Sequence, residues 1–75
     1  MKVTVKLIGP LIYESGFSEK ELEFPGPMTA GELSVYVKIE GKRPTIVTRN
    51  GVSAAPADPL QDGDRVVISP LYSGG

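Results

Sequence analysis

The chemistry that this sequence could perform is concentrated in its last five residues, Leu71-Tyr72-Ser73-Gly74-Gly75. Two glycines at a free carboxyl terminus carry no side-chain bulk, so a terminal carboxylate there could pass through a narrow channel. A fully extended tail of this length reaches roughly 16 Å, at about 3.3 Å per residue, which is long enough to enter another protein's active site. Because chain ends are often disordered and bland in composition, the tail alone does not establish this use.

The rest of the sequence offers few reactive groups. It has no cysteine and no histidine, which excludes disulfides and zinc–thiolate sites and removes the commonest general base. A formal net charge of -1 argues against nucleic acid as a partner. No apolar run approaches the roughly 20 residues that span a bilayer, and no secretory signal is apparent. We therefore expect a cytoplasmic protein without a nucleic-acid or membrane partner, whose reactive group is its terminal carboxylate.

Two further patterns could suggest ligand sites, but each has a simpler structural interpretation. Residues 26–31 have the glycine spacing of a phosphate-binding loop, yet an acidic residue, Glu32, stands where that loop needs lysine. Asp58, Asp62 and Asp64 lack the spacing of a calcium-binding loop and are typical of turns. We therefore predict no metal site and no catalytic side chain.

The elements that would hold the tail begin with two alternating segments. Residues 2–8 and 19–24 alternate polar and apolar side chains, which predicts two half-buried strands in an antiparallel hairpin. The segment 11–18 between them is interpreted as a loop. In the first strand Val3, Val5 and Leu7 face inward; in the second Leu22 and Phe24 face inward while Glu19, Glu21 and Glu23 face water; in the loop Ile12, Tyr13 and Phe17 fold back on the sheet.

A helix should follow. Thr29 and Glu32 have the form of a capping box, in which each side chain accepts a hydrogen bond from the backbone of the other residue. The helix is expected to end near Gly41. Its buried stripe would be provided by Ala30, Leu33, Tyr36 or Val37, and Ile39.

The last part of the chain predicts two more strands. Residues 45–49 form the first of them and Asn50-Gly51 a tight turn, because both positions tolerate positive φ. Residues 53–59 are expected to form a surface loop, and residues 65–69 the final strand, after which Pro70 ends regular pairing. One helix between two pairs of strands, with the last strand parallel to the first, predicts an α+β fold in which one sheet wraps round one helix.

Several segments together resemble the ubiquitin-like sulfur carrier proteins, and most closely the small subunit of molybdopterin synthase, to which the thiamine-pathway sulfur carrier is related. The resemblance implies a β-grasp fold with a mixed sheet of four to five strands, residues 1–70 as the domain and residues 71–75 as a flexible tail. The segments that carry it are the start KVTVKLIGPL at 2–11, the helix entry MTAGEL at 28–33, the turn Asn50-Gly51, the run LQDGDRVVISP at 60–70 and the ending Gly74-Gly75.

The resemblance also implies a mechanism at the tail. An E1-like adenylating enzyme would use ATP to activate the carboxylate of Gly75, and a sulfurtransferase or persulfide donor would convert it to a thiocarboxylate. This group would then donate sulfur to an acceptor synthase, such as the large subunit of molybdopterin synthase. Gly74 and Ser73 would allow the tail to thread into its partners. The residues expected to dock those partners are Pro70, Leu71 and Tyr72.

In this interpretation the chain is a carrier and cosubstrate, not an enzyme, and binds no cofactor of its own. Two alternatives use the same fold. The chain could carry sulfur for thiamine or another pathway, or it could be a protein modifier or a non-covalent interaction module. A modifier would join Gly75 to lysine amines, whereas an interaction module would leave it unmodified.

Overall fold

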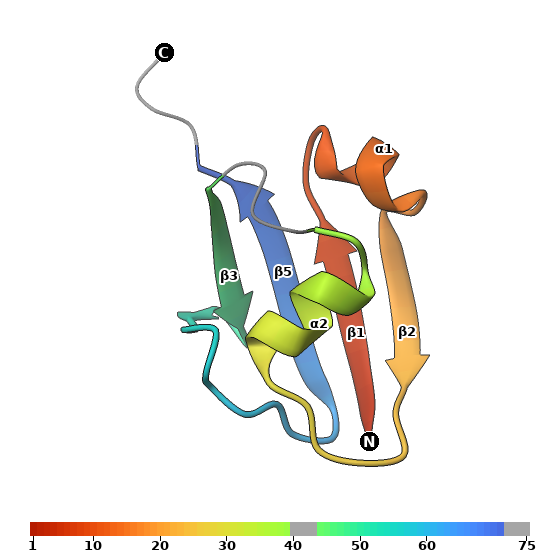
Figure 1. The fold of residues 1–75 in the computed structure, drawn as a ribbon, viewed down its shortest axis with the longest axis vertical. Helices are drawn as coiled ribbons and strands as arrows, with labels where there is room; N and C mark the ends of the chain where they lie inside the picture. The colour runs from red at the N-terminus through yellow and green to blue at the C-terminus, as the bar shows by residue number, and fades with distance from the viewer. Residues whose placement is uncertain (40–43, 72–75) are drawn as a thin grey trace.

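The computed structural model describes residues 1–39 and 44–71 of the 75-residue chain. One mixed sheet of five strands, in the order β2-β1-β5-β3-β4, carries a helix, α2, across one of its faces (Figure 1). A sheet with one apolar face is stable only when another element covers that face. The predicted α+β architecture, in which one sheet wraps round one helix, is confirmed.

The first two strands, β1 (Lys2–Leu7) and β2 (Glu19–Glu23), form the predicted antiparallel hairpin. Val3, Val5 and Leu7 are at most 1% exposed. Alternate side chains of a strand point to opposite faces, so these three lie on the face that α2 covers.

The last strand, β5 (Asp64–Pro70), lies at the centre of the sheet between β1 and β3 (Thr45–Arg49). It runs parallel to β1, as predicted, and antiparallel to β3. The predicted Asn50-Gly51 turn follows β3, with φ of 54° at Asn50 and 83° at Gly51. The turn leads into β4 (Val52–Ser53), a strand too short for its alternation to be recognised in the sequence.

Helix α2 (Ala30–Tyr36) begins at the predicted capping box. The Thr29 hydroxyl accepts the Glu32 N–H at 3.2 Å, and the Glu32 carboxylate accepts the Thr29 N–H at 2.9 Å. The helix ends at Tyr36 and not near Gly41, so this part of the prediction is wrong. Its end is rich in β-branched residues, which are weak helix formers, and Lys38 adopts a left-handed φ of 68°.

The structure also decides between Tyr36 and Val37 as the residue on the buried stripe, an alternative that the sequence left open. Val37 is 4% exposed, whereas Tyr36 is 59% exposed and packs edge-on against Phe24 with ring centroids 5.0 Å apart. Ala30 and Leu33 are buried as predicted.

A second short helix, α1 (Leu11–Ser15), lies where a loop was predicted. Pro10 precedes it with a φ of -64°, and Gly16 closes it with a φ of 87°. The fixed φ of proline suits the start of a helix and a left-handed glycine suits its end, so these two residues frame a helical turn within the segment that was interpreted as a loop. Tyr13, which was predicted to fold back on the sheet, instead projects outward and is 88% exposed.

The core lies between the sheet and α2. Its buried members come from β1, α1, α2, β5 and the segments that follow β2 and α2 or precede β5, and Ile12 and Phe17 pack against its edge as predicted. Its buried members are Val3, Val5, Leu7, Leu11, Phe24, Ala30, Leu33, Val37, Ile39, Leu60, Val66 and Ile68.

Candidate functional site at the end of the central strand

The central strand holds the chain in the sheet almost to its carboxyl end. Pro70, the last residue of β5, pairs with Thr45, and the Leu71 N–H donates to the Pro44 carbonyl at 3.1 Å. The described chain therefore ends beside the start of β3 (Figure 1). The predicted roles of Tyr72, Ser73, Gly74 and Gly75 concern residues outside the described ranges and stay predictions.

Pro70 lies at a position of β5 where the lack of an N–H leaves the pairing with β3 intact. The Arg65 carbonyl accepts the Asn50 N–H at 2.8 Å and the Leu71 N–H donates to the Pro44 carbonyl, so the odd-numbered residues of this segment direct their backbone groups toward β3. The even-numbered residues, Pro70 among them, direct theirs toward β1. Pairing with β1 ends at Ile68, so the missing N–H of Pro70 has no partner to lose. The predicted end of regular pairing at Pro70 is confirmed: β5 and its pairing with β3 end there, one backbone hydrogen bond from Leu71 follows, and pairing with β1 already ends at Ile68.

Beside this point, apolar side chains emerge on the sheet face that α2 does not cover. We call Ile46, Val67 and Leu71 the outer strip. Ile46 is 41% exposed, Leu71 is 53% exposed, and Val67 is half-buried between Lys6 of β1 and Thr48 of β3. The strip adjoins the base of the tail. Of the residues predicted to dock partners, Pro70 is buried and Leu71 presents an exposed side chain.

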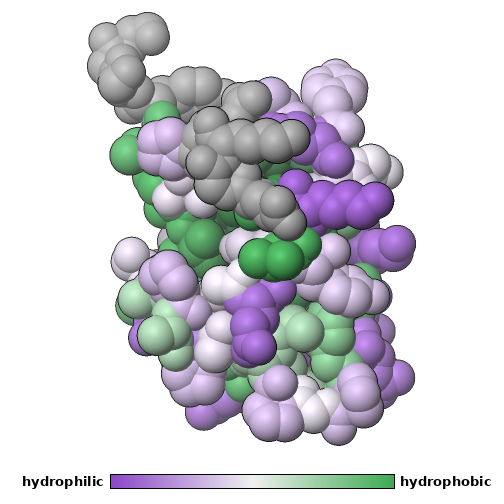
Figure 2. Space-filling view, in the orientation of Figure 1, coloured by the Kyte–Doolittle hydropathy of each residue, from purple (hydrophilic) through white to green (hydrophobic). Residues whose placement is uncertain are grey.

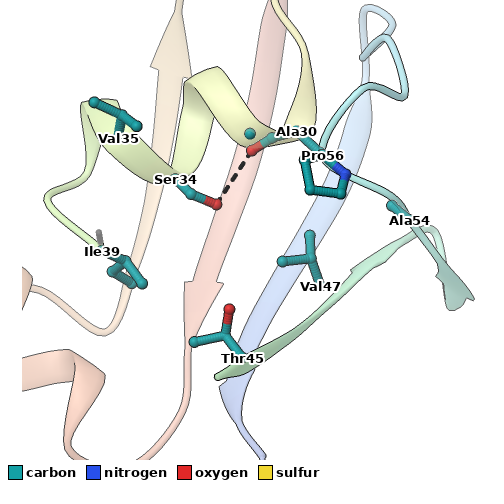
Figure 3. A pocket seen from close by; sticks show the side chains of 9 residues that line it. Ala30, Ser34, Val35, Ile39, Thr45, Val47, Ala54 and Pro56 are labelled. Atoms are coloured by element: carbon teal, nitrogen blue, oxygen red, sulfur yellow. Dashed lines mark hydrogen bonds between the residues drawn. The ribbon is translucent and has the colours of Figure 1, made fainter. Parts of the chain in front are cut away.

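On the opposite face, a groove that the sequence did not reveal separates α2 from β3 (Figure 3). Its volume is about 440 Å³, and apolar surface gathers over this part of the molecule in Figure 2. The Ser34 hydroxyl, which could have made the groove polar, instead donates to the Ala30 carbonyl at 3.1 Å. The lining residues are Ala30, Gly31, Ser34, Val35, Ile39, Thr45, Val47, Ala54 and Pro56.

Gly31 sets the width of one end of this groove. Its N–H donates to the Pro56 carbonyl at 2.9 Å, and a Cβ added at Gly31 would lie 3.0 Å from that oxygen. A glycine in the first turn of a predicted helix is a signal of such close approach. Because none of the lining side chains titrates or is a strong nucleophile, the groove can bind an apolar group but offers no side chain for acid–base chemistry.

The run Asp62-Gly63-Asp64 ahead of β5 has a structural role. Asp64 is 5% exposed and accepts hydrogen bonds from the Gln61 N–H at 2.7 Å and the Asn50 amide at 2.9 Å. The Arg49 guanidinium lies 3.7 Å from the same carboxylate. These contacts tie the start of β5 to the turn that follows β3, and so fix the strand from which the tail departs.

The other two aspartates are also engaged in turns, as predicted. Asp62 accepts the Lys2 N–H at 2.7 Å and Asp58 accepts the Ala55 N–H at 2.9 Å. Within residues 1–39 and 44–71, no three acidic, histidine or cysteine side chains are grouped so that they could hold a metal ion. In the same ranges, neither helix is long and apolar enough to span a bilayer.

Comparison with solved structures shows which fold this domain has. A putative molybdopterin converting factor subunit 1 from Pyrococcus furiosus matches with a TM-score of 0.82 and 22% identity, over 96% of this chain and 99% of that one. SAMP1, a small archaeal modifier protein from Haloferax volcanii, matches with a TM-score of 0.78 and 24% identity over 100% of both chains. A complex of subunits 1 and 2 of the Helicobacter pylori molybdopterin-converting factor matches with a TM-score of 0.65 and 21% identity, again over 100% of both chains.

At these identities the likeness establishes the fold, which is the predicted β-grasp fold of ubiquitin-like proteins. No curated protein matches the sequence. The model of the ThiS family matches residues 5–75, which is nearly the whole chain and includes both terminal glycines. The chain therefore belongs to the ThiS family, and the resemblance to ubiquitin-like sulfur carriers is confirmed.

Proposed function

We propose that this chain is a sulfur carrier in molybdopterin synthesis, in which the carboxylate of Gly75 is adenylated and then converted to a thiocarboxylate. The observation that carries the proposal is the family match through Gly75, on a domain whose central strand holds the chain as far as Leu71. Four residues follow Leu71, and at about 3.3–3.6 Å per residue they span at most about 14 Å. A tail of that length suits an active site in a partner protein.

The chemistry must be supplied mainly by those partners. A carboxylate is a poor electrophile, so an E1-like enzyme would direct its oxygen to the α-phosphorus of ATP and release pyrophosphate. The terminal sulfur of a donor persulfide would then attack the acyl carbon and expel AMP. A thiol would reduce the resulting acyl disulfide, leaving the thiocarboxylate on Gly75. Holding the reacting groups in line, which the narrow tail permits, supplies much of the rate in such steps.

The domain would serve as the handle for these enzymes. The outer strip of Ile46, Val67 and Leu71 adjoins the base of the tail, so a partner that engulfs the tail would meet this apolar surface next. Apolar anchors near the centre of an interface carry most of its binding energy. We assign the strip, with Leu71 as its most exposed member, to docking of the adenylating enzyme and of the acceptor synthase.

The molybdopterin pathway is favoured by two of the structural likenesses. One is to a subunit 1 of molybdopterin converting factor, and the other is to such a subunit in complex with subunit 2. The acceptor proposed here is accordingly an equivalent of subunit 2. A carrier for thiamine synthesis would use the same activated tail with a different acceptor.

A second candidate is a protein modifier, which the likeness to SAMP1 favours. A modifier would need the same adenylation of Gly75, but its product would be an isopeptide bond to a lysine amine. The two candidates therefore diverge only after activation. A carrier yields a thiocarboxylate that an acceptor synthase consumes, whereas a modifier yields adducts of higher mass.

Exchange of labelled pyrophosphate into ATP by the host's E1-like enzyme tests the activation step. The full chain should support exchange, and a variant lacking Gly75 should reduce it to the level of the enzyme alone. Equal exchange with and without Gly75 would refute the assignment of the reacting carboxylate. To separate the two candidates, the sulfide-treated chain is then incubated with the subunit 2 equivalent and, separately, with a lysate that supplies lysine amines. Loss of sulfur from the chain to the subunit 2 equivalent alone supports the carrier, whereas adducts of higher mass in the lysate support the modifier.

A further inference from the structure

The sheet has an open edge on the side opposite β3 and β4. β2 is the outermost strand and, among residues 1–39 and 44–71, pairs only with β1 (Figure 1). Leu7 donates to the Ser18 carbonyl at 2.8 Å and Phe24 donates to the Met1 carbonyl at 2.8 Å, which sets the phase of the ladder. Backbone groups of successive residues in a strand point to alternate sides. In β2 the groups of Lys20 and Leu22 therefore face β1.

The residues between them point their backbone outward. Within the described ranges, no hydrogen bond from another segment reaches the outward N–H and C=O groups of Glu19, Glu21 and Glu23. Such a row of unpaired groups is a template for one more strand. Affinity would come from main-chain hydrogen bonds, and selectivity from the side chains on either face of the added strand.

A hollow of about 160 Å³ lies beside this edge, on the face that α2 covers. Phe17 and Leu22 form part of its wall and pack against the core, and the exposed ring of Tyr36 closes one side. A cavity of about 150 Å³ accommodates a molecule the size of benzene, so the open hollow has room for one medium side chain, whose apolar part would contact Phe17 and Leu22. The full lining is Ser15, Phe17, Lys20, Leu22, Tyr36, Val37 and Lys38.

Charge on the two faces of β2 defines what the added strand must carry. Glu19, Glu21 and Glu23 line the outer face, and hydrophilic side chains run along this edge in Figure 2. Lys20 lies on the hollow's side, with its ammonium 5.6 Å from the centre of the Phe17 ring. Opposite charges stabilise directly opposed residues of paired strands and like charges destabilise them. Basic residues therefore suit the outer face of the added strand and apolar residues suit the hollow.

A second copy of this chain fits the edge poorly. Antiparallel pairing of β2 with its own copy would set the glutamates of one chain opposite those of the other, which like-charge repulsion disfavours. If a basic strand paired with β2 one residue out of register, its side chains would change faces and its cations would lie near Lys20 and Lys38. Like-charge repulsion therefore also favours one register of the added strand. β1 illustrates the preferred complement, since its Lys2 and Lys6 stand opposite Glu23 and Glu19 on the other side of β2.

We propose that the outer edge of β2 is a docking site for an extended segment of another protein in which basic residues alternate with apolar ones. The segment adds a sixth strand to the five-stranded sheet, with its basic side chains on the glutamates and one apolar side chain in the hollow. This site lies at the edge of the sheet opposite β4 and does not rest on the proposed function. It would let the chain be held by one partner while its tail is used by another.

The probe is the peptide acetyl-K-V-T-V-K-L-amide, which repeats residues 2–7, titrated into the ¹⁵N-labelled full chain and followed by NMR. Its matched control is acetyl-E-V-T-V-E-L-amide. We expect shifts and slowed hydrogen exchange at the amides of Glu19, Glu21 and Glu23 with the basic peptide, and about tenfold weaker binding of the acidic one. Equal binding of both peptides, shifts centred on β3, or no shifts at the solubility limit would each overturn the proposal.

Three variants separate edge pairing from mere charge attraction. Glu21→Gln removes the charge alone, whereas Glu21→Pro removes the same charge and an outward N–H, a loss that an edge strand tolerates. The proline variant should abolish binding that the glutamine variant keeps, while the β1 amides keep their shifts. Glu21→Lys combined with Glu23→Lys should exchange the preference of the two peptides. Undiminished binding to the proline variant, an unchanged preference in the double variant, or self-association through β2 without peptide would refute the assigned occupant.

Discussion

The sharpest prediction about the scaffold concerns Asp64, whose buried carboxylate joins the start of β5 to the turn after β3. In Asp64→Ala, the Gln61 N–H and the Asn50 amide lose their acceptor, and the Arg49 guanidinium loses its nearby anion. A hydrogen bond to a charged group contributes about 1.5–3 kcal/mol, and removing one partner of a buried ion pair costs about 3–5 kcal/mol. Because Arg49 retains a 2.7 Å hydrogen bond to the Pro59 carbonyl and is partly exposed, we expect the low end.

The expected loss is about 3 kcal/mol from a total free energy of unfolding of roughly 4–11 kcal/mol for a chain of this length. At about 4–8 °C per kcal/mol, the melting temperature should fall by about 12–24 °C. Urea titration and thermal melting of the full chain measure both quantities.

The neighbouring aspartate provides a matched control. Asp62 is exposed and accepts one hydrogen bond, from Lys2, so Asp62→Ala should cost only about 1 kcal/mol. If the two variants lose equal stability, or if Asp64→Ala melts within a few degrees of the wild type, the buried network does not hold β5 as described.

Three smaller predictions follow from other contacts. Thr29→Ala removes the cap of α2 and should lower the free energy of unfolding by about 1 kcal/mol, whereas Thr29→Ser should restore most of it in the same urea titration. Gly31→Val forces a side chain against Pro56 and should cost about 1–3 kcal/mol, while Gly26→Ala, which meets nothing within 4 Å, should stay within about 0.5 kcal/mol; equal melts would contradict the close approach. Leu71→Glu should raise the KM for adenylation about tenfold with an unchanged melting temperature, and an unchanged KM would exclude Leu71 from docking.

The features that the sequence predicted correctly are those encoded by neighbouring residues. Alternation is local, and it identified both strands of the first hairpin and their inward faces. The Thr29 and Glu32 capping box and the Asn50-Gly51 turn depend on a few consecutive residues, and both form as predicted.

The errors arose where packing decides between local possibilities. Pro10 and Gly16 suit a loop or the two ends of a helical turn, and burial of Leu11 selects the helix. The end of α2 was predicted too late because the helix stops before Lys38, which adopts a left-handed conformation. No glycine or proline stands at that position to signal the stop in the sequence.

The two hollows could not be predicted because each is built from separate parts of the chain. The larger groove needs α2, β3 and the segment around Pro56 to be assembled, and only Gly31 hinted at the close approach. The smaller hollow depends on Tyr36 facing outward, which the sequence left open between Tyr36 and Val37. The outer strip, by contrast, follows from alternation along β5 once the sheet order is known.

The most direct test of the central claim is the intact mass of the chain after incubation with ATP, its E1-like adenylating enzyme and sulfide. We predict that the mass corresponds to a chain ending at Gly75 and rises by the difference between a sulfur and an oxygen atom, with the change located by fragmentation to Gly75. An unchanged mass, with no adenylate formed, would contradict the account and leave a ubiquitin-like domain whose glycine ending has no part in sulfur transfer.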